Sequence, residues 1–364
     1  MKDRFQNFNS GRVIFFLMSV ITAILFAAVL KITSSVILPF TVSLLLAFVT
    51  TPLVKFLEKF RIPRVISIFM VILILIAGLA FIVMVIYSSG RTILNVYPKY
   101  EARLTEIYIW SARFFDLSYD EHLSIFDNLW GQLGVRNRVR SMTISFSNAF
   151  ISFLTDAVMV TIFLVFLLVE AVFIMQKLDM AFEGNRAGRI KKISADIINQ
   201  VSRYLSIKFF ISIANGIILG VGFTIIGVEF AVLWGILQFV GNFIPNFGSI
   251  TVGLAGTLFS LIQFWPEPGP VIATALLVLG MNLILSYIVE PKITGDNLGL
   301  SPLVILLSLL VWGWLWGFTG LIIAVPMMVI VKIVCENIPM LEPISILLGS
   351  RKAALAVKSD GGGD

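Results

Sequence analysis

The sequence has few charged residues and almost none of the side chains that build catalytic or metal centres. Only 13% of its 364 residues are charged, against about a quarter in soluble globular proteins. A single cysteine, Cys335, excludes an internal disulfide and a dithiol redox centre, and a single histidine, His122, argues against a histidine-based metal site. The patterns G-x-x-x-x-G-K-[ST], H-E-x-x-H and G-x-S-x-G are absent as well. We therefore predict no enzyme, no catalytic residue, no cofactor and no metal.

Hydrophobic residues, in contrast, make up 58% of the chain. They form blocks of about 20, the length of helix that crosses about 30 Å of hydrocarbon. An outer-membrane barrel would instead show alternating segments of about ten residues. The sequence predicts an all-α polytopic membrane protein with about eight hydrophobic segments, embedded in the lipid bilayer. Its net charge of +6 then reflects Lys and Arg in cytoplasmic loops rather than a nucleic acid partner.

The order of apolar and charged stretches predicts how the chain is organised. The first apolar block, 13–30, is too long for a signal peptide and no cleavage site follows it, so we expect a retained span. Clusters of Lys and Arg predict that both termini are cytoplasmic. We predict spans 1 to 3 in 1–88, an external helical insertion in 89–145, span 4 with a cytoplasmic amphipathic segment in 146–207, a transport core in 208–335, and a cytoplasmic tail in 336–364.

Two apolar segments of the predicted core are interrupted by glycine, proline and asparagine. The stretch VGNFIPNFGS breaks the segment 229–264 at 241–248, and WGWLWGFTG breaks the segment 302–333 at 312–320. If both segments were ordinary spans, the flanking loops would oppose the positive-inside rule. Two re-entrant hairpins in an inverted arrangement, with six full spans, satisfy it. Paired interrupted segments of this kind indicate the binding site of a secondary transporter. Eight ordinary spans is the alternative.

The interrupted segments also carry a family resemblance. The stretch IVEPKITGDNLGLSPLVILLSLLVWGWLWGFTGLIIAVP (288–326), together with NFIPNFGSI (242–250), resembles the autoinducer-2 exporter-like (AI-2E) family of bacterial membrane proteins. The chain follows that family's layout over about residues 13–335. The resemblance implies a multi-span transporter of the bacterial inner membrane that forms a homo-oligomer, with a pentamer expected. Some members of the family export a small furanone signal, and others have been linked to sodium/proton antiport.

Polar and conformationally special residues at the breaks are the candidates for a substrate path. Pro245 lacks an N–H and frees a carbonyl near residue 241. Freed backbone groups at membrane depth are tolerated only where protein or a wet cavity satisfies them. The asparagines either hold helices together or contact a polar solute, and both readings stay open. The predicted substrate or ion path comprises Asn215, Gly241, Asn242, Pro245, Asn246, Gly248, Asn282, Gly313 and Gly317.

The few ionisable residues in or beside apolar segments are candidates for gating or ion coupling. Glu290 and Lys292 either pair with each other and fix the end of the seventh span, or act as a cytoplasmic gate. Asp156 and Glu229 lie near the outer ends of predicted spans. The predicted gate or coupling residues are Asp156, Glu170, Glu229, Glu290, Lys292, Gly295 and Asp296.

Three hypotheses for function follow. The first is a secondary transporter that exports a small polar organic molecule, such as an autoinducer-2-like signal, by alternating and elevator-like movement of 208–335. The second is a sodium or potassium/proton antiporter. The third is a non-transporting membrane scaffold or receptor that uses 89–145 to bind an external partner.

Overall fold

The computed structural model describes residues 10–114, 135–171, 173, 177, 180, 184–245, 247–294, 299–338 and 341–349. These residues are almost entirely helical, and the β-structure among them is one isolated bridge between Leu300 and Gly349. Within the described residues, seven helices are long and apolar enough to cross a membrane. The prediction of an all-α polytopic membrane protein is confirmed.

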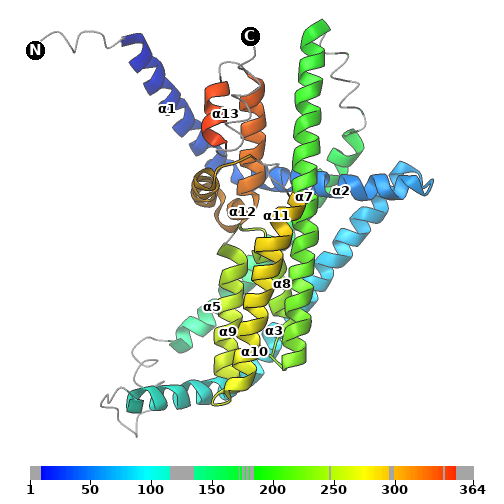
Figure 1. Cartoon of the computed structure of the whole chain (residues 1–364). Helices are drawn as coiled ribbons and strands as arrows, with labels where there is room; N and C mark the ends of the chain where they lie inside the picture. The colour runs from blue at the N-terminus through cyan, green and yellow to red at the C-terminus, as the bar shows by residue number, and fades with distance from the viewer. Residues whose placement is uncertain are drawn as a thin grey trace, which may run out of the picture. The chain divides into compact units, whose positions relative to one another are not determined.

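The helices run in the order shown in Figure 1. They are α1 (Ser10–Ile32), α2 (Ser34–Lys59), α3 (Arg64–Phe114), α5 (Val135–Glu170), α7 (Gly184–Ile226), α8 (Ala231–Gly241), α9 (Phe247–Phe264), α10 (Pro268–Met281), η2 (Asn282–Val289), α11 (Glu290–Thr294), α12 (Pro302–Asn337) and α13 (Glu342–Leu348). Two compact units divide the chain: Met1–Leu46 with Leu300–Asp364, and Ala47–Gly299. The predicted core, 208–335, therefore contains helices of both units.

Two helices are longer than the sequence predicted. α3 has 51 residues and α7 has 43, so at 1.5 Å per residue each is about 65 Å long or more and exceeds the hydrocarbon thickness. The expected amphipathic surface segment and the fifth span form the single helix α7, because no proline interrupts 184–226. The start of the predicted external insertion likewise continues α3 beyond Ile93, where its membrane-spanning part ends. Pro98 lies inside this extension.

The first interrupted segment folds back on itself. α8 has only 11 residues, about 17 Å of helix, and α9 returns beside it. Gly241 and Gly248 meet at the reversal: an ideal Cβ on Gly248 would lie 1.7 Å from the Gly241 oxygen, so only glycine permits the contact. Further along, Gly256 of α9 lies beside Trp234 of α8. We call residues 231–264 hairpin 1. A single crossing over 229–264 does not match this geometry.

The second interrupted segment also reverses, although its two arms form one element, α12. Trp316 and Gly317 have non-helical dihedral angles, and φ of Gly317 is 61°. The Ser308 hydroxyl donates a hydrogen bond to the Ala324 carbonyl at 2.8 Å, whereas a straight helix would separate these residues by about 24 Å. We call 302–337 hairpin 2. In the same unit, the Trp316 indole donates to the Leu30 carbonyl of α1 at 3.1 Å.

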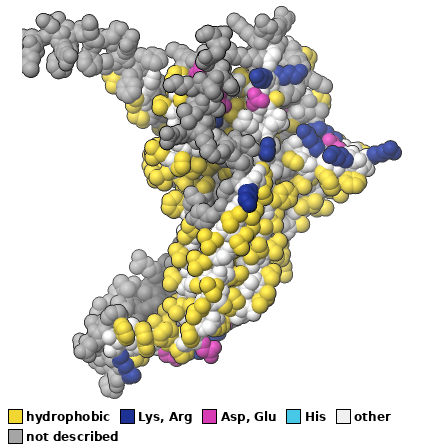
Figure 2. Space-filling view, in the orientation of Figure 1, with side chains coloured by type: hydrophobic (Ala, Val, Ile, Leu, Met, Phe, Trp, Pro, Cys, Tyr) yellow, Lys and Arg dark blue, Asp and Glu magenta, His cyan; other side chains and the backbone are white. Residues whose placement is uncertain are grey.

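Four helices, α7 to α10, pack into one bundle within the second unit. Their common core contains Leu219 and Phe223 of α7 with Val278 and Met281 of α10. α7 and α8 approach so closely that an ideal Cβ on Gly216 would lie 2.7 Å from the Gly235 oxygen. The visible surface over α9 and α10 is mostly hydrophobic, and acidic side chains gather at the end where these helices join (Figure 2). Lipid is the medium that such a surface suits.

The Gly241–Gly248 contact predicts a large effect of one methyl group. Gly248→Ala forces a carbon against a backbone oxygen, and we expect a loss of stability above about 3 kcal/mol, beyond the usual range for overpacking. The measurement is the thermal unfolding midpoint of the purified protein in detergent. Gly280→Ala is the matched control, because nothing lies within 4 Å of its added carbon. Equal unfolding midpoints for the two variants would contradict the hairpin geometry.

Candidate functional site

Buried polar side chains from α7, α8, α9 and the segments that directly follow α8 and α10 gather at one level of the bundle. They belong to helices that are otherwise strongly apolar, and each is at most 8% exposed. We call them the polar layer, which comprises Ser212, Asn215, Gln238, Asn242, Ser249 and Asn282.

Helix contacts fix this common level. The Asn242 amide donates to the Ser212 hydroxyl at 3.0 Å, which aligns the end of α8 with α7. Asn215 and Gln238 lie about one turn away on these same two helices. Across the bundle, Gly253 of α9 is in contact with Asn282, since an ideal Cβ on Gly253 would lie 3.7 Å from the Asn282 amide nitrogen. The polar layer therefore lies next to the reversal of hairpin 1.

Several polar atoms of the layer are left without partners. The amide groups of Asn215 and Asn282 each donate back to a carbonyl of their own helix, at 3.1 and 2.9 Å. Their side-chain oxygens, and both polar atoms of the Gln238 side chain, have no hydrogen-bond partner within the described part of the chain. The buried hydroxyl of Ser286 also has no hydrogen-bond partner among the described residues. Each such group costs about 1–3 kcal/mol when left unpaired, so the layer carries hydrogen-bonding capacity that the described residues do not use.

Asn282 also begins an unusual stretch of backbone. Residues 282–289 form the π-helix η2, which leads directly to Glu290 at the start of α11. π-Helical turns are rare and occur frequently at functional sites.

Of the predicted path residues in hairpin 1, Gly241 and Asn242 are buried and Pro245 is partly buried, whereas Asn246 lies outside the described residues. The path residues Gly313 and Gly317 lie at the reversal of hairpin 2, in the other compact unit.

Glu290 makes an ion pair, but not with Lys292. The Lys208 ammonium lies 2.6 Å from the Glu290 carboxylate, and Lys208 is only 4% exposed. This pair joins α7 to α11 beyond the polar layer. Lys292 is exposed, so the expected Glu290–Lys292 contact is replaced by one between helices. Gly295 and Asp296 lie outside the described residues.

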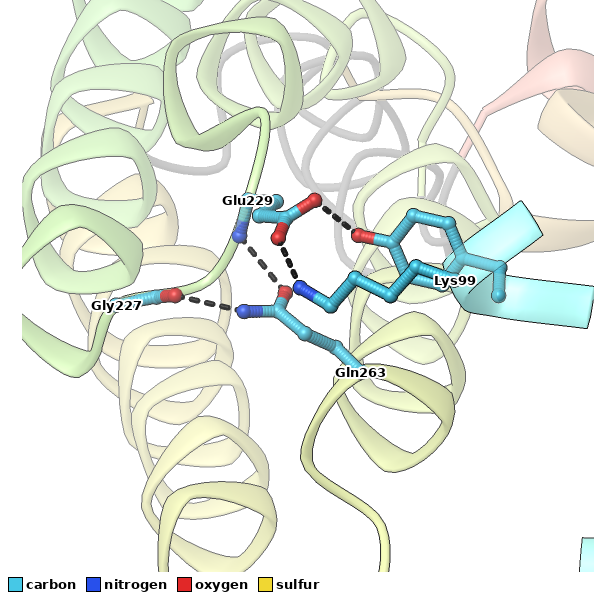
Figure 3. Close-up of polar contacts among 5 residues, drawn as sticks. Lys99, Gly227, Glu229 and Gln263 are labelled. Carbon is cyan, nitrogen blue, oxygen red and sulfur yellow. Dashed lines mark hydrogen bonds and ion pairs between the residues drawn. The ribbon is translucent and has the colours of Figure 1, made fainter. Parts of the chain in front are cut away.

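Glu229 lies at the opposite end of the bundle, in the loop between α7 and α8 (Figure 3). Its carboxylate accepts hydrogen bonds from Lys99, at 2.5 Å, and from the hydroxyl of Tyr100. Gln263 of α9 fixes the loop: it donates to the Gly227 carbonyl and accepts from the Glu229 N–H, both at 2.8 Å. Partial burial raises the pKa of Glu229, but the hydrogen bonds from Lys99 and Tyr100 outweigh this effect and hold the pKa below its ordinary value.

The remaining charged candidates lie apart from these groups. Asp156 is exposed on α5, and Glu170, at the end of α5, pairs with Lys177. Among the described residues, no group of three or more His, Cys, Asp or Glu could hold a metal ion.

The sequence analysis did not select Gln238, Ser212, Ser249, Lys99, Tyr100 or Gln263. A signal existed only for Gln238, the one polar side chain in AVLWGILQFVG.

Comparisons with known proteins agree with this architecture. The family model described as "AI-2E family transporter" matches residues 16–340. The chain is similar to "AI-2 transport protein TqsA" of Escherichia coli K12, with 29% identity over 305 residues that cover 82% of this chain and 84% of the relative. It is similar to a "Putative transport protein" of Borreliella burgdorferi, with 38% identity over 202 residues, and this alignment spans 56% of each chain. "Putative transport protein YhhT" of Escherichia coli K12 is 27% identical over 306 residues, which cover 82% of this chain and 83% of the relative.

The ion pair between the buried Lys208 and the partly buried Glu290 predicts a non-additive result. Lys208→Met leaves the Glu290 carboxylate without its partner, and we expect a loss of about 3 kcal/mol in unfolding free energy. The double variant Lys208→Met/Glu290→Gln removes both charges and should recover most of that loss. Chemical unfolding of the purified variants measures both values. Equal losses in the single and double variants would mean that the pair contributes nothing beyond packing.

The lowered pKa of Glu229 predicts a pH-dependent contribution to stability. A group whose pKa falls on folding stabilises the protein above its ordinary pKa and loses that contribution as the pH falls through the folded value. Wild type should therefore unfold at a higher temperature than Glu229→Gln at pH 7, with the difference shrinking below pH 4.5. Glu267→Gln, at an exposed carboxylate in the neighbouring loop, is the control. A difference that persists unchanged under acid conditions would contradict the assigned contacts.

Proposed function

This chain belongs to the AI-2E transporter family, and we propose that it exports a small polar organic molecule across the membrane. Its family and its apolar helices make it a multi-pass membrane transporter. The relative TqsA is named for transport of AI-2, and an autoinducer-2-like signal is the substrate class that we propose here.

The observation that carries this proposal is the set of unpaired polar atoms in the polar layer. Asn215, Gln238 and Asn282 present three amide oxygens as acceptors, and Gln238 also presents an NH₂ group as donor. These groups are neutral, so they suit an uncharged solute whose hydroxyl groups both donate and accept hydrogen bonds. A hydroxylated furanone has this chemistry. An anion or a bare cation would need charge in the layer to offset its desolvation.

The transport step that we propose is alternating access. The region 208–335 would move, in an elevator-like way, against a scaffold built from the first four spans. The break of hairpin 1 would then face the solute, as interrupted helices do in secondary transporters. We further propose a homo-oligomer, with a pentamer as the expected assembly, in a bacterial inner membrane with both termini in the cytoplasm.

A second candidate function, sodium or potassium/proton antiport, has one observation in its favour. Glu290, which directly follows the π-helix η2, pairs with the buried Lys208, and an ionisable pair beside a membrane span can exchange a proton for a cation. A fluorescence dequenching assay on vesicles with an imposed pH gradient decides the matter. A response to added Na⁺ or K⁺ that Glu290→Gln abolishes would favour antiport over export.

The proposed binding role predicts opposite effects on stability and on transport. Gln238→Met removes two unpaired buried polar atoms at similar side-chain volume, so the unfolding midpoint should stay the same or rise. Efflux of a hydroxylated furanone from proteoliposomes should fall about tenfold, the factor that about 1.4 kcal/mol of lost binding represents.

Thr257→Val is the matched control for this experiment. It is also a polar-to-apolar change of similar volume, on α9, but its hydroxyl donates to the Gly253 carbonyl of its own helix and it is not part of the polar layer. We expect wild-type efflux from this variant. A stable Gln238→Met protein with wild-type efflux would remove the layer from the substrate path.

A further inference from the structure

The extension of α3 beyond the membrane contacts both ends of hairpin 1. At one end, Lys99 and Tyr100 bind the carboxylate of Glu229, in the loop that precedes α8. At the other, the ring of Trp110 packs edge-on against Trp265, just after α9, with 5.3 Å between centroids. A single helix therefore bridges the two ends of the moving element that the transport proposal requires.

The loop that receives this contact is built for precise placement. Both Gly227 and Phe230 have positive φ, at 87° and 59°. For a bulky residue such as phenylalanine this conformation costs about 1–3 kcal/mol, and it persists only where the surroundings determine it. The two hydrogen bonds of Gln263 stabilise this backbone conformation, because they hold the loop against the end of α9 (Figure 3). The Glu229 carboxylate is consequently held in position to meet α3.

The contact itself is suited to reversible release. The side chains of Lys99 and Glu229 are 48% and 30% exposed, and ion pairs with such exposure contribute little net stability. The Tyr100 ring adds an aromatic contact to Phe259 of α9, with 5.2 Å between centroids. Together, these weak contacts can hold the α3 extension against hairpin 1 and can still separate at low energetic cost.

We propose that Lys99, Tyr100 and Glu229 form a latch that fastens the α3 extension to the base of hairpin 1, and that the latch opens in every transport cycle. The proposal rests on the proposed transport function, since it assigns a gate to the same moving element. Gln238, the first residue of the polar layer along α8, lies nine positions after Glu229, or about 14 Å of helix, so Lys99, Tyr100 and Glu229 act on the position of the hairpin and not on the solute.

Protonation is not the trigger for opening. The hydrogen bonds from Lys99 and Tyr100 hold the pKa of the Glu229 carboxylate below its ordinary value, so the folded state favours the ionised form. Its neighbours preserve this state: burial and the bond to Glu229 raise the pKa of the Tyr100 hydroxyl, which therefore stays a donor. Movement of hairpin 1 relative to α3 is the event that separates the groups.

A reducible crosslink tests the latch. Lys99→Cys and Glu229→Cys are introduced into a Cys335→Ser protein, which removes the single native thiol, and are joined by a bifunctional methanethiosulfonate reagent. Furanone efflux should fall in proportion to the crosslinked fraction and return after reduction. Arg103→Cys/Glu106→Cys is the matched control, because that ion pair lies within α3 and its crosslink fastens nothing to the core. Full efflux from the crosslinked 99/229 protein would overturn the proposal.

A second measurement is independent of any transported solute. Phe259→Cys, in the same Cys335→Ser background, reports opening through its labelling rate with a water-soluble maleimide. The added change Glu229→Gln should raise this rate several-fold over that of the Phe259→Cys protein, since the two proteins differ only in the carboxylate that Lys99 and Tyr100 bind. Equal labelling rates would overturn the latch even if no substrate is found. Faster labelling without furanone efflux would support the latch and reject the proposed substrate instead.

Discussion

The reversal between α8 and α9 depends on one close approach of backbone, between the Gly241 carbonyl and Gly248. Any larger residue at position 248 would separate the arms, and the polar layer beside them would lose its shape. The reversal stops α8 after 11 residues and brings Asn242 within hydrogen-bond distance of Ser212 on α7. Irregular backbone at membrane depth is stable only inside protein or beside a wet cavity. The reversal therefore positions the polar layer, and the polar layer in turn provides the environment that the irregular backbone of the reversal needs.

Charged and neutral polar groups in the bundle follow different rules. Two ion pairs join helices at its ends: Lys208 with Glu290 at one end, and Lys99 with Glu229 at the other. An unpaired buried charge would cost several kcal/mol, which applies to Lys208, whereas Lys99 and Glu229 are partly exposed. Both pairs join helices. The amides between them are neutral, and some of their atoms have no partner among the described residues. Because a neutral unpaired group costs only about 1–3 kcal/mol, it can be kept for a ligand. This difference supports our proposal that the ends of the bundle fasten helices together and that its middle binds the solute.

The sequence predicted the helical membrane class, the family and both interruptions, because apolar block length and Gly/Pro spacing are local signals. It did not predict that Glu290 contacts Lys208 rather than Lys292, since 82 residues separate the actual partners. The Lys99–Glu229 pair spans 130 residues and was equally invisible. Helix continuity was underestimated as well: the charged first half of α7 suggested a separate surface helix, yet no residue there ends the hydrogen-bond ladder. Gln238 was overlooked although a lone glutamine in an apolar helix was a usable signal.

The central claim is that a polar solute completes the hydrogen bonds of the polar layer. The most direct measurement is an experimental map of the protein in lipid nanodiscs, with and without a hydroxylated furanone. We predict solute density within hydrogen-bond distance of the Asn215, Gln238 and Asn282 side chains, and none at that place in the Gln238→Met protein. Density at another position, or a map in which these three side chains bond only to one another in the presence of solute, would contradict the claim.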